Sequence, residues 1–118
     1  MPVAGPEDLF RCREAMAMIH FDSLVLDYVL NLVRATRKES PIARHLSIGA
    51  SPRASLALMN GARAHAFLKG RPYVTPDDVK MIAHDVLRHR LLLSFEAEAQ
   101  GLSPEWVIDK ILQTTRAP

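Results

Sequence analysis

The chain has 118 residues, of which 48% are hydrophobic and 24% are charged, the composition of an ordinary globular domain. This length fits one domain, so we expect 1–118 to form a single unit. The net charge of +2 gives only weak attraction to polyanions, no apolar run approaches the length of a membrane span, and the single cysteine, Cys12, excludes an internal disulfide. A lone cysteine and no secretory signal pattern indicate a cytoplasmic protein.

The sequence predicts five helices, and most of them begin with a capping residue or a proline. The predicted helices cover residues 6–19, 23–38, 52–69, 76–88 and 104–113. In the first, Leu9, Cys12 and Met16 recur at helical spacing and predict a buried side. The second helix follows an N-cap at Asp22, and a break at Ser40-Pro41 comes after it because a residue before proline avoids the helical region.

The helix at 52–69 is predicted to be central. Apolar side chains occupy most of its circumference, which is typical of a helix covered by several neighbours, and Gly70 is its stop signal. The next helix starts with Thr75 as N-cap and Asp78 as the acid of a capping box. Residues 91–93 form an apolar run that is either a short strand or a helix end. The chain is therefore predicted to be mainly all-α, a small bundle of four to five helices with at most a very short strand pair.

The segment from Gly49 to Arg53 carries the strongest functional signal. Ser51 predicts an N-cap, and Pro52 suits the first helical position. Arg53 then lies in the first turn, where a cation opposes the helix dipole, so stability alone does not explain it. A helix start favours anions and a guanidinium matches phosphate bidentately, so Ser51, Pro52 and Arg53 form a candidate phosphate-binding site. The alternative is a solvated surface arginine.

The sequence lacks the residue patterns of a metal site, a reactive thiol or a complete ATPase site. The histidines are scattered without the i, i+4 spacing of a helical zinc site, and Cys12 has no Cys-x-x-Cys partner, so we expect no metal site. Cys12 falls on a side predicted to be buried, where a thiol is inert. A G-x-x-x-x-G-K-S/T phosphate loop and an apolar run ending in Asp-Glu are both absent. We therefore expect that this chain alone does not hydrolyse ATP, although it can contribute one cation to a nucleotide held elsewhere.

Five motifs occur in an order that resembles the C-terminal helical lid of MoxR-type AAA+ ATPases. They are residues 32–37, 49–56 (GASPRASL), 71–80 (RPYVTPDDVK), 86–91 and 95–101. The resemblance covers nearly the whole chain, which is identified as the lid domain alone. Residues 2–6 would then correspond to the junction that leaves the nucleotide-binding core domain.

The resemblance implies specific roles. Arg53 is similar to the sensor-2 arginine that approaches the γ-phosphate of ATP, with Ser51 and Pro52 aiming it, on the nucleotide of its own subunit or of a neighbour. ATP and Mg²⁺ would be held mainly by the core domain, whose nucleotide-binding motifs have no counterpart here. The implied partners are that core, neighbouring subunits of a ring (a hexamer by resemblance) and a protein client of a chaperone-like machine.

Two alternative functions remain open on the residues. A helical nucleic-acid-binding domain would use the basic residues within 34–44 and 88–90, but 15 basic against 13 acidic residues is a balanced charge. A free-standing protein-interaction domain would have no nucleotide role, and Arg53 would be an ordinary salt-bridge residue. Dependence on the γ-phosphate in a complete protein discriminates between these functions and the lid function.

Overall fold

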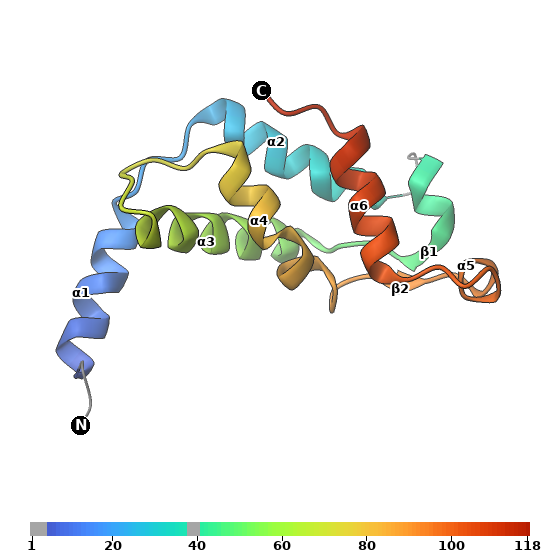
Figure 1. Ribbon diagram of the computed structural model, residues 1–118, viewed down its shortest axis with the longest axis horizontal. Coiled ribbons are helices and arrows are strands. Elements are labelled where there is room, and N and C mark those ends of the chain that lie inside the picture. Colours follow the sequence, from blue (N-terminus) through green and yellow to red (C-terminus); the bar gives the residue numbers. More distant parts are fainter. Residues whose placement is uncertain (1–4, 38–40) are drawn as a thin grey trace.

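The computed structural model describes residues 5–37 and 41–118. Within these residues the elements are, in chain order, α1 (Pro6–Ala17), α2 (Ser23–Arg34), the 3₁₀ helix η1 (Pro41–His45), β1 (Leu46–Ile48), α3 (Pro52–Leu68), α4 (Pro76–Leu87), β2 (Leu92–Leu93), α5 (Phe95–Ala99) and α6 (Pro104–Thr114) (Figure 1). The mainly all-α bundle with a very short strand pair is confirmed. No helix in the described part of the chain is long and apolar enough to cross a membrane.

Helix α3 is the central element, as the sequence predicts. It packs most extensively against α4, and α2 and α1 also contact it (Figure 1). Its buried side consists of Ala54, Leu58, Ala62 and Ala66, and three alanines among four residues let the neighbouring helices approach closely. The neighbours do not cover the whole circumference, because Leu56 and Leu68 at other positions around the helix are exposed.

The hydrophobic core lies between α2, α3, α4 and α6. Its largest fully buried apolar side chains are Tyr28, Leu32, Leu58, Leu87, Ile108 and Ile111. Helix α6 packs against α4 and η1. Two polar contacts connect α4 with α6, from His84 Nε2 to Asp109 at 2.8 Å and from Arg88 Nε to Glu105 at 2.5 Å. The last helix therefore closes the core that the three earlier helices form.

The short strands decide the ambiguity at 91–93. Strands β1 and β2 pair antiparallel, with Leu46 opposite Leu93 and Ile48 opposite Leu92, so this run is a strand and not a helix end. Helix α5 follows directly and is an element that the sequence analysis did not predict. The Ser94 hydroxyl caps it by accepting a hydrogen bond from Ala97 N at 3.2 Å. Five residues are too few to show a helical period, so only the cap residue could have signalled it.

Helix α1 does not bury the side that its sequence pattern predicts. None of its residues is buried, Leu9 is 64% exposed, and Cys12 is partly exposed, so the prediction of a buried thiol was wrong. The reason is that only the C-terminal half of α1 meets the bundle, at a hollow lined by Met16 and Ala17 together with α3. The N-terminal half extends away from the other helices (Figure 1).

Several helix ends also differ from the prediction. Helix α1 ends at Ala17 instead of residue 19, and α2 ends at Arg34 instead of residue 38. Gly70 and Gly101 have φ values of +74° and +77°, which confirms the stop signal after α3 and the chain break before α6. Residues 2–4 of the expected junction at 2–6, and Ser40 of the expected helix break at Ser40-Pro41, lie outside the described residues.

Candidate functional site

The three predicted site residues lie where β1 leads into α3. Ser51 has an extended backbone (φ −81°, ψ 169°), and Pro52 is the first helical residue. Ser51 therefore occupies the predicted N-cap position. Its side chain makes no capping hydrogen bond, and the first turn of α3 holds no acidic residue. The positive end of the α3 dipole thus has no carboxylate from its own first turn beside it.

Arg53 is exposed and makes no ion pair or hydrogen bond with the described residues. The other arginine of α3 is different, because the guanidinium carbon of Arg63 lies 5.4 Å from the centre of the Phe21 ring. Arg71 and Arg88 are paired with carboxylates. The guanidinium of Arg53 is therefore available to an anion from outside these residues.

The loop before α3 is fixed to the end of α2 by Thr36. This residue is only 2% exposed, and its hydroxyl donates a hydrogen bond to Val33 O at 2.6 Å while accepting one from Ala50 N at 2.9 Å. A Cβ atom at position 49 would lie 2.1 Å from the Thr36 carbonyl oxygen, so this approach requires Gly49. The start of α3, and with it the position of Arg53, is held by these contacts.

A hollow of about 490 Å³ opens beside this fixed loop. Its walls are Thr36 and Arg37 at the end of α2, Ala43 of η1, and several residues from Leu46 to Ser51. Among the described residues that line it there is no aspartate or glutamate, and Arg37 adds a second cation next to the start of α3. The surroundings of Arg53 therefore favour an anionic ligand. The described residues around it offer no carboxylate for a divalent cation.

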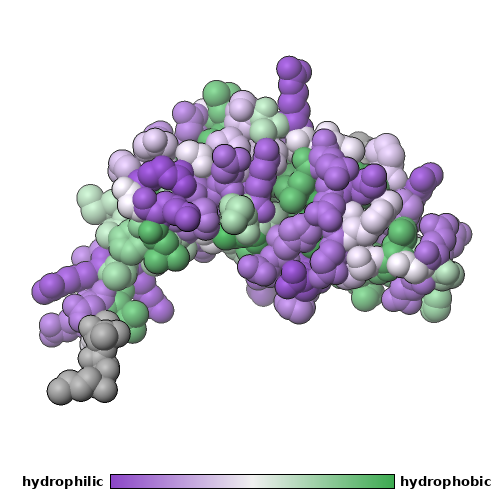
Figure 2. Space-filling view, viewed as in Figure 1, coloured by the Kyte–Doolittle hydropathy of each residue, from purple (hydrophilic) through white to green (hydrophobic). Residues whose placement is uncertain are grey.

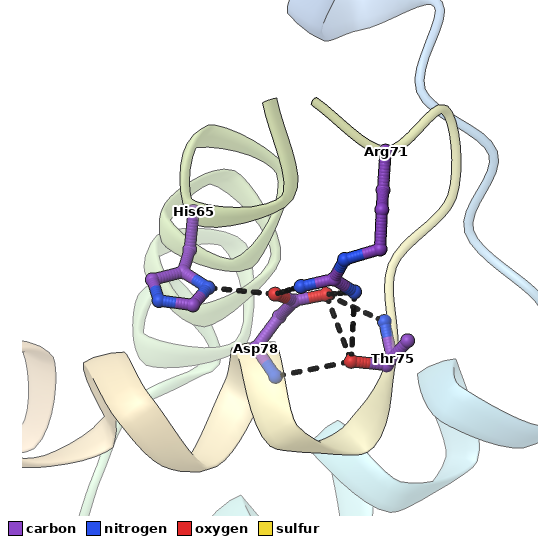
Figure 3. A network of polar contacts seen from close by, with 4 residues as sticks. All are labelled: His65, Arg71, Thr75 and Asp78. Carbon is purple, nitrogen blue, oxygen red and sulfur yellow. Dashed lines mark hydrogen bonds and ion pairs between the residues drawn. The ribbon is translucent and has the colours of Figure 1, made fainter. Parts of the chain in front are cut away.

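A second polar cluster joins α3 to the start of α4 (Figure 3). Asp78 is fully buried and receives hydrogen bonds from both terminal nitrogens of Arg71 (2.8 and 2.6 Å) and from Thr75 N at 2.7 Å, while His65 Nδ1 lies 2.6 Å from its carboxylate. Burial raises the pKa of Asp78, but the hydrogen bonds from Arg71, Thr75 and His65 outweigh it and lower the pKa to about 2. The partners of Asp78 all come from this chain, so this cluster stabilises the helix junction and is not an open site.

Three of the histidines also have structural partners for their side chains. His65 and His84 each contact an aspartate, and the His45 ring meets Trp106 edge-on with ring centres 5.1 Å apart. Within residues 5–37 and 41–118, no three His, Cys, Asp or Glu side chains come together in a way that could hold a metal ion.

Sequence reasoning missed two residues that matter here. Thr36 has no sequence signal for its role, because its partner Ala50 lies 14 residues away and contributes only a backbone N–H. Asp78 was recognised as a capping-box acid, and that box is present, but its pairing with Arg71 and His65 was not predicted. The sequence offered one signal for this pairing: Asp78 lies seven residues after Arg71, on the side of α4 that is buried.

Comparison with known proteins places this chain in a family. The AAA lid domain family matches residues 38–111. The chain is 43% identical over 116 residues to the chaperone MoxR1 of Mycobacterium tuberculosis, covering 94% of this chain and 31% of that protein. It is 32% identical to the protein YeaC of Bacillus subtilis, covering 99% and 35%. A solved structure of a candidate ATPase from Cytophaga hutchinsonii superposes with a TM-score of 0.89 at 34% identity, over 95% of this chain and 36% of that one.

The helical bundle with its central helix α3 is thus that of an AAA+ lid. The chain belongs to the AAA lid domain family, and its relatives identify it as a lid of the MoxR type. It spans about a third of the length of the relatives that it matches.

Proposed function

We propose that Arg53 is the sensor-2 arginine of a MoxR-type AAA+ ATPase and contacts the terminal phosphate of ATP held by a separate nucleotide-binding domain. The observation that carries this proposal is an exposed guanidinium without a partner among the described residues, on a helix start that Thr36 and Gly49 hold in place. A cation at this end opposes the dipole of α3, so its position is better explained by an external anion than by stability.

The residues of the site have distinct parts in this function. Arg53 donates hydrogen bonds to the phosphate oxygens in the planar, two-pronged geometry that guanidinium provides, and it stabilises negative charge during phosphoryl transfer. Ser51 and Pro52 set the direction of the first turn from which Arg53 projects. ATP with Mg²⁺ supplies the reactive phosphoanhydride. None of the described residues that line the hollow beside the site carries a carboxylate, which supports a magnesium ion held by the nucleotide-binding domain.

The same contact makes the lid responsive to nucleotide state. Arg53 has a ligand when the γ-phosphate is present and loses it after hydrolysis, and such a difference in binding free energy shifts a domain equilibrium. The Thr36–Ala50 hydrogen bond connects the start of α3 to α2, so displacement of Arg53 is transmitted to the bundle.

We further propose that the longer protein works as a cytoplasmic chaperone-like ring, with a hexamer as the expected assembly. The support is the 43% identity to a protein that is itself named a chaperone. In this arrangement the partners of the lid are its own core domain, the neighbouring subunits and a protein client.

The test is ATP turnover by the longer protein with Arg53→Ala. We expect kcat to fall by roughly tenfold or more, equivalent to about 1.4 kcal/mol of lost transition-state stabilisation. Arg53→Lys retains the positive charge without the two-pronged geometry of guanidinium. Its kcat should therefore lie between that of the parent protein and that of Arg53→Ala. Circular dichroism of the 118-residue chain with the same substitutions should be unchanged, because Arg53 is exposed.

The matched control is Arg116→Ala, an exposed arginine in the C-terminal tail beside α2. This substitution also removes one positive charge, but at a position far from the start of α3. It should leave ATP turnover unchanged. Equal turnover and equal ATP affinity in Arg53→Ala and the parent protein would refute the sensor function and favour a free-standing interaction domain.

A further inference from the structure

A hollow of about 350 Å³ lies between α1 and the C-terminal half of α3, and it is called the α1–α3 pocket here. The two helices meet at the end of α3 that is away from β1 (Figure 1). Figure 2 shows hydrophilic side chains on the projecting part of the molecule that α1 forms. Each helix contributes three described residues with the i, i+3, i+4 spacing of one helix face. They are Arg13, Met16 and Ala17 of α1 and Asn60, Arg63 and Ala64 of α3.

Two arginines line this pocket from facing helices, and both have unused hydrogen-bond donors. Neither Arg13 nor Arg63 makes a hydrogen bond or an ion pair with another residue in 5–37 or 41–118. The Nε atom of Arg63 is buried without a partner in this part of the chain. The Phe21 ring, 5.4 Å from the guanidinium carbon, holds that group in place without accepting its N–H donors. Unused donors on a partly buried arginine indicate an acceptor from outside these residues.

Two other helix junctions of the bundle pair their arginines with carboxylates. Arg71 meets Asp78 where α3 leads into α4, and Arg88 meets Glu105 between α4 and α6. The described residues that line the α1–α3 pocket include no carboxylate. The neighbouring Glu14 of α1 is not among them, and it forms no ion pair with either arginine of the pocket. Two positive charges that face one hollow repel each other, and an anion between them removes that repulsion.

The charge of the pocket discriminates between kinds of anion. A carboxylate carries one negative charge and neutralises one guanidinium, whereas a phosphate group carries about −1.5 to −2 at pH 7 and matches both. Guanidinium also binds phosphate oxygens in a planar, two-pronged geometry. The exposed amide of Asn60 adds further N–H donors on the same wall as Arg63. A volume of about 350 Å³ lies in the range of small-molecule pockets, so a phosphate group fits together with part of its hydration shell.

We propose that the α1–α3 pocket is a binding site for a phosphate dianion, with Arg13 and Arg63 as its cationic ligands and Asn60 as a further donor. Because one arginine comes from each helix, the bound phosphate connects α1 to α3. The site is separate from the proposed contact of Arg53 with a nucleotide and does not depend on it. Arg63 follows Arg53 by ten positions on the same helix, about 15 Å at helical rise, so one phosphate group does not reach both.

The test is a titration of the 118-residue chain with sodium phosphate at pH 7 and constant ionic strength, followed by amide NMR shifts. We expect saturable shifts at residues 13–17 and 60–64. Arg13→Ala and Arg63→Ala should each weaken phosphate binding by roughly tenfold or more. Arg13 is exposed, so its substitution leaves the fold intact and keeps the test valid if Arg63→Ala loses its packing on Phe21 and unfolds.

The matched control is Arg11→Ala, an exposed arginine on α1 that is not among the described residues lining the pocket. It removes the same charge from the same helix and should leave phosphate affinity unchanged. Acetate, with its single charge, should bind at least tenfold more weakly than phosphate. Titration with AMP identifies the source of the phosphate group. Tighter binding of inorganic phosphate assigns the site to the free ion, tighter binding of AMP assigns it to a phosphate monoester, and both results support the proposal.

Three results would overturn it. They are shifts confined to the start of α3, which would place the phosphate at Arg53, acetate binding equal to phosphate binding, and an equal loss of affinity in Arg11→Ala and Arg13→Ala. An absence of saturable shifts would refute it as well. None of these measurements uses ATP turnover. Full activity of Arg53→Ala would therefore contradict only the sensor function, and a failed titration would contradict only the α1–α3 phosphate site.

Discussion

The buried hydroxyl of Thr36 accepts a 2.9 Å hydrogen bond from the backbone N–H of Ala50, three residues before Arg53. Through this bond the end of one helix determines where the next helix begins. The same hydroxyl donates to Val33 O at 2.6 Å, so its single donor is used and the geometry is fixed from both sides. The position of the candidate phosphate ligand is therefore set by a residue that does not touch the ligand.

Thr36→Val should reveal this role. Valine has nearly the same shape but leaves the buried Ala50 N–H without its acceptor, which costs about 1–3 kcal/mol of unfolding free energy. Thr36→Ser retains the hydroxyl and should cost clearly less. Urea unfolding of the 118-residue chain measures both variants. If Thr36→Val and Thr36→Ser lose the same unfolding free energy, packing of the Thr36 methyl group matters and the hydrogen bond does not.

Gly49→Ala should disturb the same contact from the side of the loop before α3. The new Cβ would lie 2.1 Å from the Thr36 carbonyl oxygen, so the backbone must shift. We expect a loss of about 1–3 kcal/mol in unfolding free energy, the usual cost of overpacking. In the longer protein we also expect a lower kcat, because Arg53 follows the shifted loop. Gly5→Ala, where a Cβ meets nothing within 4 Å, is the control for thermal unfolding.

Acid should weaken the α3–α4 junction through Asp78. Its pKa is lowered from 3.8 to about 2 in the folded chain. A lowered pKa gives stability that is complete above the unfolded pKa and is lost as the pH falls through the folded one. The loss should therefore occur between about pH 4 and pH 2 and amount to about 2 kcal/mol. Unfolding free energies measured across this range test it, and Asp78→Asn should remove that part of the pH dependence.

Two leucines on α3 should differ sharply although they are two positions apart. Leu58 is fully buried, whereas Leu56 is 60% exposed. Leu58→Ala should cost about 2–5 kcal/mol of unfolding free energy through lost burial and a cavity. Leu56→Ala should stay within about 0.5 kcal/mol. Thermal or urea unfolding measures both, and similar losses would mean that Leu56 is covered by a partner in solution.

Local signals explain most of what could be predicted. Pro52, Pro76 and Pro104 each occupy the start of a helix, because proline lacks the N–H that a helix start does not need. Gly70 adopts the positive φ that ends α3. The all-α class and the order of the five longer helices follow from such positions, and the candidate site residues were found from the same rules.

Burial followed the periodic pattern only where a neighbour exists to cover it. The apolar spacing in α2 correctly predicts that Val25, Tyr28 and Val29 are buried. The equivalent spacing in α1 predicts a buried Leu9, which is exposed, because a period identifies an apolar side without identifying what packs against it.

The sequence by itself determined where helices start and stop, because proline, glycine and capping side chains act on their own few residues. It also placed Arg53 in a first turn, since that depends only on adjacent positions. The tertiary structure alone decided that Thr36 holds Ala50, that Arg71 and His65 both meet Asp78, and that α1 stays uncovered. These features depend on residues that are distant along the chain, and only packing of the helices decides which of them meet.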